Sequence, residues 1–188
     1  MAHEDTILAD MESLRIADKH VIGDLMAHRK IWTKGASTVN NSTKNLNTLV
    51  DRGKLVKCDG FYRMPDCKSE YKGHARLLTK AIAEILKLNL NAKIFREKEI
   101  KEVGLRPDAL VLLERYGRFL CFVLEVCENE FPEYLTQKVN TWNQYENAKE
   151  TLFTLFETRI KAFDIVVSGD ITVDGVFEFN QYLAEVMK

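Results

Sequence analysis

Two acidic residues lie in otherwise apolar stretches of the sequence, and they are the residues best placed to do chemistry. Asp108 follows Pro107 and precedes the apolar run 109–113, while Glu125 lies near the end of a second run, 119–127. Burying a carboxylate is costly unless a cation compensates its charge, and two adjacent carboxylates repel each other. We therefore expect a positive partner beside Asp108 and Glu125.

The two apolar runs have the pattern of neighbouring β-strands. Pro107 stands just before the first run, and Gly117 with its charged neighbours marks a turn into the second. Side chains alternate along a strand, so one face of the second strand carries Phe119, Cys121, Val123, Glu125 and Cys127. This arrangement would bring Glu125 next to Asp108.

Apolar periodicity predicts a mixed α/β (α+β) fold for the chain as a whole. Helices are expected over 4–14, 17–26 and 39–50, the last capped by Ser37 or Thr38. Further along, the pattern predicts a helix from about residue 70, a strand over 92–100 and the two central strands. The remaining predicted elements are a helix beginning at 131–133, a helical pattern over 152–160, a strand over 162–167 and a helix over 179–187.

Three helices followed by a basic hairpin around Asp59-Gly60 resemble a winged helix-turn-helix. That resemblance implies that the third helix enters the major groove of DNA and that the hairpin is the wing. The segment 65–69 is the expected boundary, so residues 1–66 would form the DNA-binding domain and residues 67–188 a second domain.

The charge pattern of the first domain suits DNA, although the formal net charge of the whole chain is only −1. Between Arg15 and Arg63 there are ten Lys or Arg residues against four Asp or Glu residues. Amides can pair with adenine, and lysines neutralise phosphates. The predicted DNA contacts are Lys34, Ser37, Thr38, Asn40, Asn41, Ser42, Lys44, Asn45, Lys54, Lys57 and Arg63. The alternatives are a solvated helix face and a protein-interaction surface.

The second domain resembles the PD-(D/E)XK nuclease superfamily, with an αβββαβ core. Pro107-Asp108 and Glu125 match its motifs, but Cys127 stands where the family has a lysine. By this resemblance Asp108 and Glu125 would hold Mg²⁺ or Mn²⁺, and Glu70 could add a helix carboxylate. Lys138 on the following helix could replace the missing lysine, which would make Asp108, Glu125, Lys138 and Glu70 the catalytic set of an active enzyme.

A simpler alternative is an ion pair between Glu125 and Lys138, which would satisfy the carboxylate without metal. Hard cations prefer oxygen ligands, so a thiol at position 127 suits Mg²⁺ poorly. The missing lysine and the possible ion pair together favour an inactive nuclease-like domain, which needs no cofactor and serves dimerisation or additional DNA contact.

Taken together, the chain resembles the plasmid replication-relaxation family of mobile-element proteins. The residues that carry the resemblance lie in the segments 49–53, 107–109 and 122–126, together with His74, Lys138 and Tyr145. It implies a sequence-specific regulator of replication or transcription of a plasmid, phage or other mobile element, acting as a homodimer on double-stranded DNA. The alternatives are a metal-dependent DNA endonuclease or nickase guided by the winged helix, and an adaptor that binds only proteins.

Cysteine spacing and hydropathy argue against a zinc-binding protein and against a membrane or secreted protein. The four cysteines show no C-x-x-C spacing and the four histidines are scattered, so a structural zinc site is not expected. No apolar run approaches the roughly 20 residues of a membrane-spanning helix, and the first residues are acidic where a secretory signal is basic. We expect a cytoplasmic protein with free thiols.

Overall fold

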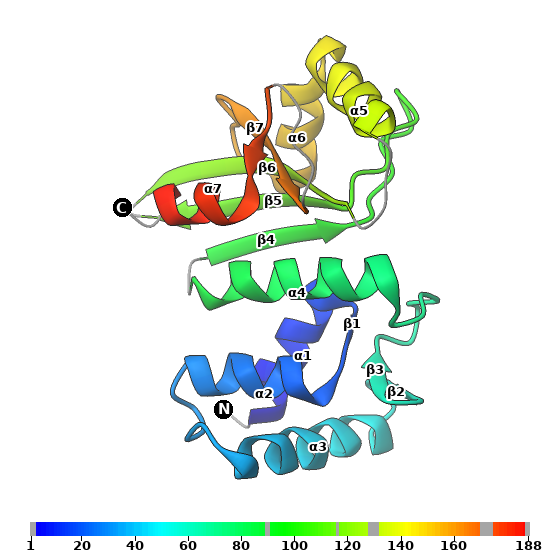
Figure 1. Cartoon of the computed structure of the whole chain (residues 1–188), viewed down its shortest axis with the longest axis vertical. Helices are drawn as coiled ribbons and strands as arrows, with labels where there is room; N and C mark the ends of the chain where they lie inside the picture. Colours follow the sequence, from blue (N-terminus) through cyan, green and yellow to red (C-terminus); the bar gives the residue numbers. More distant parts are fainter. Residues whose placement is uncertain (1–2, 89–90, 116, 128–131, 170–174, 187–188) are drawn as a thin grey trace. The chain divides into compact units, whose positions relative to one another are not determined.

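The chain forms two compact units, residues 1–89 and 90–188. The computed structural model, drawn in Figure 1, describes residues 3–88, 91–115, 117–127, 132–169 and 175–186. Each unit combines helices with its own β-sheet, so the expected mixed α/β class is confirmed. None of the helices in these described ranges has the length and apolarity that crossing a bilayer requires.

The first unit is mainly helical, with one small antiparallel sheet of order β1-β3-β2. Strand β1 was not expected, because two residues are too short to show a periodic pattern. It forms through pairing of Ile16 with Arg63 and of Ala17 with Tyr62. The elements of this unit are α1 (His3–Leu14), β1 (Ile16–Ala17), α2 (Lys19–His28), α3 (Ala36–Asp51), β2 (Val56–Cys58), β3 (Phe61–Arg63) and α4 (Gly73–Lys87).

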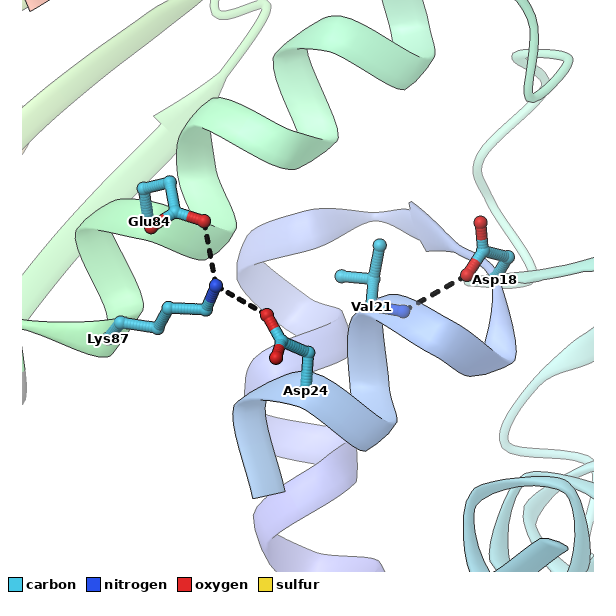
Figure 2. A network of polar contacts seen from close by, with 5 residues as sticks. All are labelled: Asp18, Val21, Asp24, Glu84 and Lys87. Atoms are coloured by element: carbon cyan, nitrogen blue, oxygen red, sulfur yellow. Dashed lines mark hydrogen bonds and ion pairs between the residues drawn. The ribbon is translucent and has the colours of Figure 1, made fainter. Parts of the chain in front are cut away.

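A side-chain cap fixes the start of α2. The carboxylate of Asp18 accepts hydrogen bonds from the backbone N–H groups of His20 and Val21, at 2.7 and 3.0 Å. Figure 2 shows the bond from Val21. These donors would otherwise be unsatisfied at a helix N-terminus. The inner face of the helix then buries Ile22 and Leu25 among the other core side chains.

Helix α4 packs with the first unit, so the division between units falls after residue 89 and not at 66/67, where the sequence placed it. The hydroxyl of Thr79 donates to the carbonyl of Ile16 over 2.9 Å. Near the other end of the helix, the Lys87 ammonium lies 2.5 Å from an Asp24 carboxylate oxygen on α2 and 2.7 Å from one of Glu84 (Figure 2). A proline such as Pro65 predicts a loop from the local sequence. It does not predict against which hydrophobic core the next helix will pack.

Gly23 of α2 packs tightly against α3. A Cβ built there would lie 2.9 Å from Ser42 Oγ and 3.2 Å from Thr38 Cγ2. We predict that Gly23→Ala lowers the free energy of unfolding by about 1–2 kcal/mol, because overpacking outweighs the gain in helix propensity. Urea unfolding measures the change. The double variant Gly23→Ala/Ser42→Ala, which removes the clashing hydroxyl, should regain stability; a stabilised Gly23→Ala would contradict the tight packing.

The second unit is built on a five-stranded sheet of order β4-β5-β6-β7-β8. Strands β4, β5 and β6 form an antiparallel meander, and β7 and β8 add parallel strands. The expected first residue of one flanking helix, 131, and the expected last residue of the closing helix, 187, lie outside the described residues. The elements are β4 (Asn91–Arg96), β5 (Ala109–Arg115), β6 (Arg118–Val126), α5 (Pro132–Gln144), α6 (Ala148–Phe156), β7 (Phe163–Ser168), β8 (Phe177–Glu178) and α7 (Phe179–Val186).

Strand β4 ends at Arg96, earlier than the predicted strand over 92–100. Glu97 adopts a φ of 51°, in the left-handed region, which takes the chain out of the extended conformation. Ile100 instead pairs with Leu105 as an isolated bridge. The loop between them leads directly to Pro107 and Asp108 at the start of β5.

The side chains of β6 divide between the two faces of the sheet. Cys121 and Val123 belong to one core cluster with Leu135 of α5 and Leu152 of α6. Phe122, which points the other way, makes an edge contact with the ring of Tyr182 on α7 at 5.2 Å between centroids. Glu125 has the same parity as Cys121, so it faces α5, as the alternation in the sequence predicts.

Candidate functional site

Helix α3 begins one turn earlier than its sequence suggests. Gly35 occupies the N-cap position, and Thr38 lies in the first turn, where its hydroxyl oxygen accepts the Gly35 N–H at 3.0 Å. The same hydroxyl donates to the carbonyl of Thr33 over 3.0 Å. The prediction that Ser37 or Thr38 is the N-cap is therefore wrong, although Thr38 satisfies a backbone donor there.

One face of α3 is polar and exposed, and it carries one acid, Asp51, at the last residue of the helix. Between Ala36 and Val50 the helix contains no Asp or Glu. The predicted DNA contacts Ser37, Asn40, Asn41 and Lys44 are exposed on it. Asn45 lies at its edge, half-buried, with its amide donating to the carbonyl of Asn41 at 2.8 Å. This face offers amides and an ammonium group to a ligand.

Two residues predicted to contact DNA do not lie on that face. Thr38 is 6% exposed and Ser42 is completely buried. Ser42 donates its hydroxyl to the carbonyl of Thr38 at 2.8 Å, which lets a polar side chain occupy the packed side of the helix. We therefore remove Thr38 and Ser42 from the candidate DNA contacts.

The β2–β3 hairpin brings further cations to α3. Lys57 is exposed, and its ammonium donates to Asn47 Oδ1 over 3.2 Å; the Tyr62 hydroxyl donates to the same oxygen at 3.0 Å. Asn47, whose residue type alone does not reveal this role, thus ties the hairpin to the helix. Lys54 is exposed just before the hairpin.

The two remaining predicted cations differ in their availability. Lys34 is exposed in the loop before α3. Arg63 is half-buried, and its guanidinium donates to the carbonyl of Cys67 at 2.7 Å. Arg63 therefore holds the segment after β3 in place, and Lys34 is the freer of the two for a phosphate.

The second unit brings Asp108 and Glu125 together as the sequence predicts. Ala109 of β5 pairs with Leu124 of β6, so Asp108 stands across from Glu125. Both are buried, at 8% and 1% exposure. One oxygen of Asp108 accepts the backbone N–H of Val126 at 2.6 Å.

Lys138 of α5 supplies the positive partner. Its ammonium lies 2.8 Å from Glu125 Oε2 and 5.2 Å from the centre of the Tyr134 ring. The other oxygen, Glu125 Oε1, has no hydrogen-bond partner among the described residues. The pair therefore compensates the charge of Glu125 but leaves one acceptor unsatisfied in the interior.

The environment raises the pKa of Glu125 to about 7, since burial and then the nearby Asp108 disfavour its charged form, against the opposing effect of Lys138. Between the ordinary value of 4.5 and 7 the folded protein holds a proton that the unfolded chain releases. This contribution to stability is complete below pH 4.5 and is lost as the pH rises through 7.

We predict that Glu125→Gln removes this loss of stability with rising pH. Relative to the wild type, the variant should gain on the order of 1–3 kcal/mol in the free energy of unfolding between pH 4 and pH 8. Denaturant unfolding at a series of pH values measures the difference. Glu146→Gln, at an exposed position of the same unit, is the control; parallel curves for wild type and Glu125→Gln would contradict the buried-carboxyl account.

The residues present do not fit a divalent metal well. Mg²⁺ keeps several water molecules, but both carboxylates are almost fully buried. Lys138 already neutralises Glu125, and the thiol of buried Cys127 offers no hard oxygen ligand. In the described part of the chain no group of three or more His, Cys, Asp or Glu residues could hold a metal ion.

Glu70, the proposed third carboxylate, is placed differently from the sequence prediction. It precedes α4, belongs to the first unit and lies 2.6 Å from the ammonium of Lys72. It is exposed and forms a local pair of low energetic value. Within the second unit, the candidate site is therefore formed by the carboxylates of Asp108 and Glu125 and the ammonium group of Lys138.

Comparison with known proteins identifies no relative of this chain. No family model, no curated protein and no solved structure matches the chain. Its function must therefore be argued from its own residues.

Proposed function

We propose that the protein binds double-stranded DNA sequence-specifically through α3 and the β2–β3 hairpin. The observation that carries this proposal is the exposed face of α3, acid-free from Ala36 to Val50, with Asn40, Asn41 and Lys44 on it and Lys57 held beside it by Asn47. A single helix fits the major groove, where an asparagine can pair with both N6 and N7 of adenine. The adjoining lysines would contact phosphates.

The arrangement of the first unit supports a winged helix-turn-helix. Three helices precede a two-stranded hairpin, and β1 pairs with that hairpin as a third strand. The absence of acids from the exposed face of α3 between Ala36 and Val50 disfavours the adaptor hypothesis, which an acidic or apolar surface would support. Phosphate contacts by Lys34, Lys54 and Lys57 would orient the helix in the groove.

The second unit supports a nuclease-like sheet that does not cleave. An antiparallel meander, a helical crossover and a parallel fourth strand follow the order expected for that core. The helix expected before the meander, α4, packs in the first unit. Because Lys138 compensates Glu125 and the pair is buried, the unit would serve dimerisation or additional DNA contact.

The resemblance to replication-relaxation proteins suggests the process that this binding would control. It is replication or transcription of a plasmid, phage or other mobile element, by a homodimer on two half-sites in the cytoplasm. Half-site spacing of one helical turn, about 10 base pairs, would be expected for such a dimer.

Selection from a random pool of duplexes tests the proposal. Rounds of binding and amplification should enrich one motif, and gel shifts at several salt concentrations should then show tighter binding to it than to scrambled duplex. Specific sites are commonly bound at least 10³-fold more tightly than non-specific DNA. If no motif is enriched and all duplexes bind alike, the proposal fails.

A metal-dependent endonuclease is the second candidate, favoured by one observation. Glu125 Oε1 keeps a free acceptor site beside Asp108. Incubation of supercoiled plasmid with Mg²⁺ or Mn²⁺ decides between the two candidates, with Asp108→Ala and Glu125→Ala as controls. We expect intact plasmid with every metal; nicking that both substitutions abolish would establish the enzyme instead.

A further inference from the structure

A second surface with the chemistry of a nucleic-acid site lies on the second unit, away from the acidic pair. A hollow of about 490 Å³ opens between the first residues of β6 and the segment that leads into β7. It is lined by Arg118, Phe119, Arg159 and Lys161, among others. Phe119 is six residues before Glu125 on the same strand, or roughly 20 Å at the rise of a β-strand.

The cations of this hollow are not neutralised by any carboxylate that the structure describes. Arg118, Arg159 and Lys161 are exposed, and within the described ranges none of them forms an ion pair with a carboxylate. Among the lining residues that the structure describes, Asp164 alone is acidic, and one of its oxygens accepts the Tyr182 hydroxyl at 2.7 Å. The hollow thus keeps an excess of positive charge that an anion would neutralise.

An exposed aromatic ring stands among these cations. Phe119 is 51% exposed, although it continues the face of β6 on which Cys121 and Val123 are buried. A large apolar side chain left in water at the end of a buried row is available for a flat partner. Nucleobases stack on such rings, while the adjoining phosphates take up the cations.

We propose that this hollow, formed by Arg118, Phe119, Arg159 and Lys161, binds single-stranded nucleic acid. In a duplex the bases are already stacked on one another, so an aromatic ring gains a base only where the strand is unpaired. A concave site of this volume also fits a nucleotide better than the convex surface of a duplex. This inference goes beyond duplex binding by α3 and does not depend on it.

The test measures binding of the full-length protein to a fluorescein-labelled 12-nucleotide oligothymidine by fluorescence anisotropy. Arg159→Glu/Lys161→Glu should weaken binding at least tenfold and reduce the slope of log K against log salt by about 1.4. Phe119→Ala should weaken it about fivefold to 150-fold, the range for loss of one stacked base, and Phe119→Trp should restore it. Lys98→Glu/Lys101→Glu, at exposed positions of the same unit, should bind like the wild type.

The same variants separate this proposal from duplex binding. Arg159→Glu/Lys161→Glu and Phe119→Ala should bind the selected duplex as the wild type does, and thermal unfolding should show that they remain folded. Absence of oligothymidine binding by the wild type at 50 mM salt, or equal binding by wild type and hollow variants, would overturn the proposal. An equal loss for duplex and single strand would overturn it too, since the hollow would then be a general phosphate contact.

Discussion

Lys138→Met is expected to lower the free energy of unfolding of the second unit by about 3–5 kcal/mol. The substitution leaves the Glu125 carboxylate buried beside Asp108 without its compensating charge. Removing one partner of a buried ion pair is costly because the remaining charge stays desolvated. Part of the cost would be relieved by protonation of Glu125, whose pKa rises further once Lys138 is removed, so the destabilisation should grow as the pH is raised towards 8.

Intrinsic fluorescence can follow the unfolding of this unit alone. Trp142 is buried in the second unit and Trp32 lies in the first, so a Trp32→Phe background isolates the relevant signal. The double variant Glu125→Met/Lys138→Met, which replaces the pair by apolar side chains, should recover most of the stability lost in Lys138→Met. A Lys138→Met protein as stable as the wild type at pH 8 would show that the pair does not hold α5 to β6.

Lys44→Glu/Lys57→Glu is expected to weaken binding to the selected duplex at least 100-fold at moderate salt. Each substitution removes a cation from the α3 surface and places an anion where a phosphate would lie. Loss of two phosphate contacts should also reduce the slope of log K against log salt by about 1.8. Gel shifts or anisotropy at 50–200 mM salt measure both quantities.

A control with the same change of charge elsewhere in the first unit shows whether the effect is local. Lys19→Glu/Lys80→Glu alters exposed positions on α2 and α4 and should weaken binding far less. Asn41→Ala should lose about 1–3 kcal/mol of preference for the selected motif while binding scrambled duplex unchanged. If the two charge-reversal pairs weakened binding equally, a diffuse field and not the α3 face would be responsible.

The spacing of apolar residues and the residue types typical of turns predicted most helices and strands of both units. The pairing of Asp108 with Glu125 and the position of Lys138 followed from strand alternation and from the helix that comes next in the chain. The two-residue strands β1 and β8 could not be predicted, because they exist only through pairing with distant partners. That α4 belongs to the first unit could not be predicted either, because it depends on packing against residues distant in sequence.

Residue type alone could not separate the two sides of α3. Asn41 and Ser42 are both polar and adjacent, yet one is exposed and the other is buried. Ser42 is tolerated inside because its hydroxyl bonds to a carbonyl of its own helix, and Gly23 leaves room for it. The packing of α3 against its neighbouring helices decides which side of α3 is buried. The role of Asn47 was missed because its partners, Lys57 and Tyr62, are distant in sequence.

Mapping the contact surface by nuclear magnetic resonance tests the central claim most directly. Uniformly ¹⁵N-labelled protein would be titrated with the selected duplex while backbone amide shifts are recorded. We predict that the largest changes fall on Asn40, Asn41 and Lys44 of α3 and on Lys57 of the hairpin. Changes confined to other elements, with α3 unperturbed at saturating duplex, would contradict it.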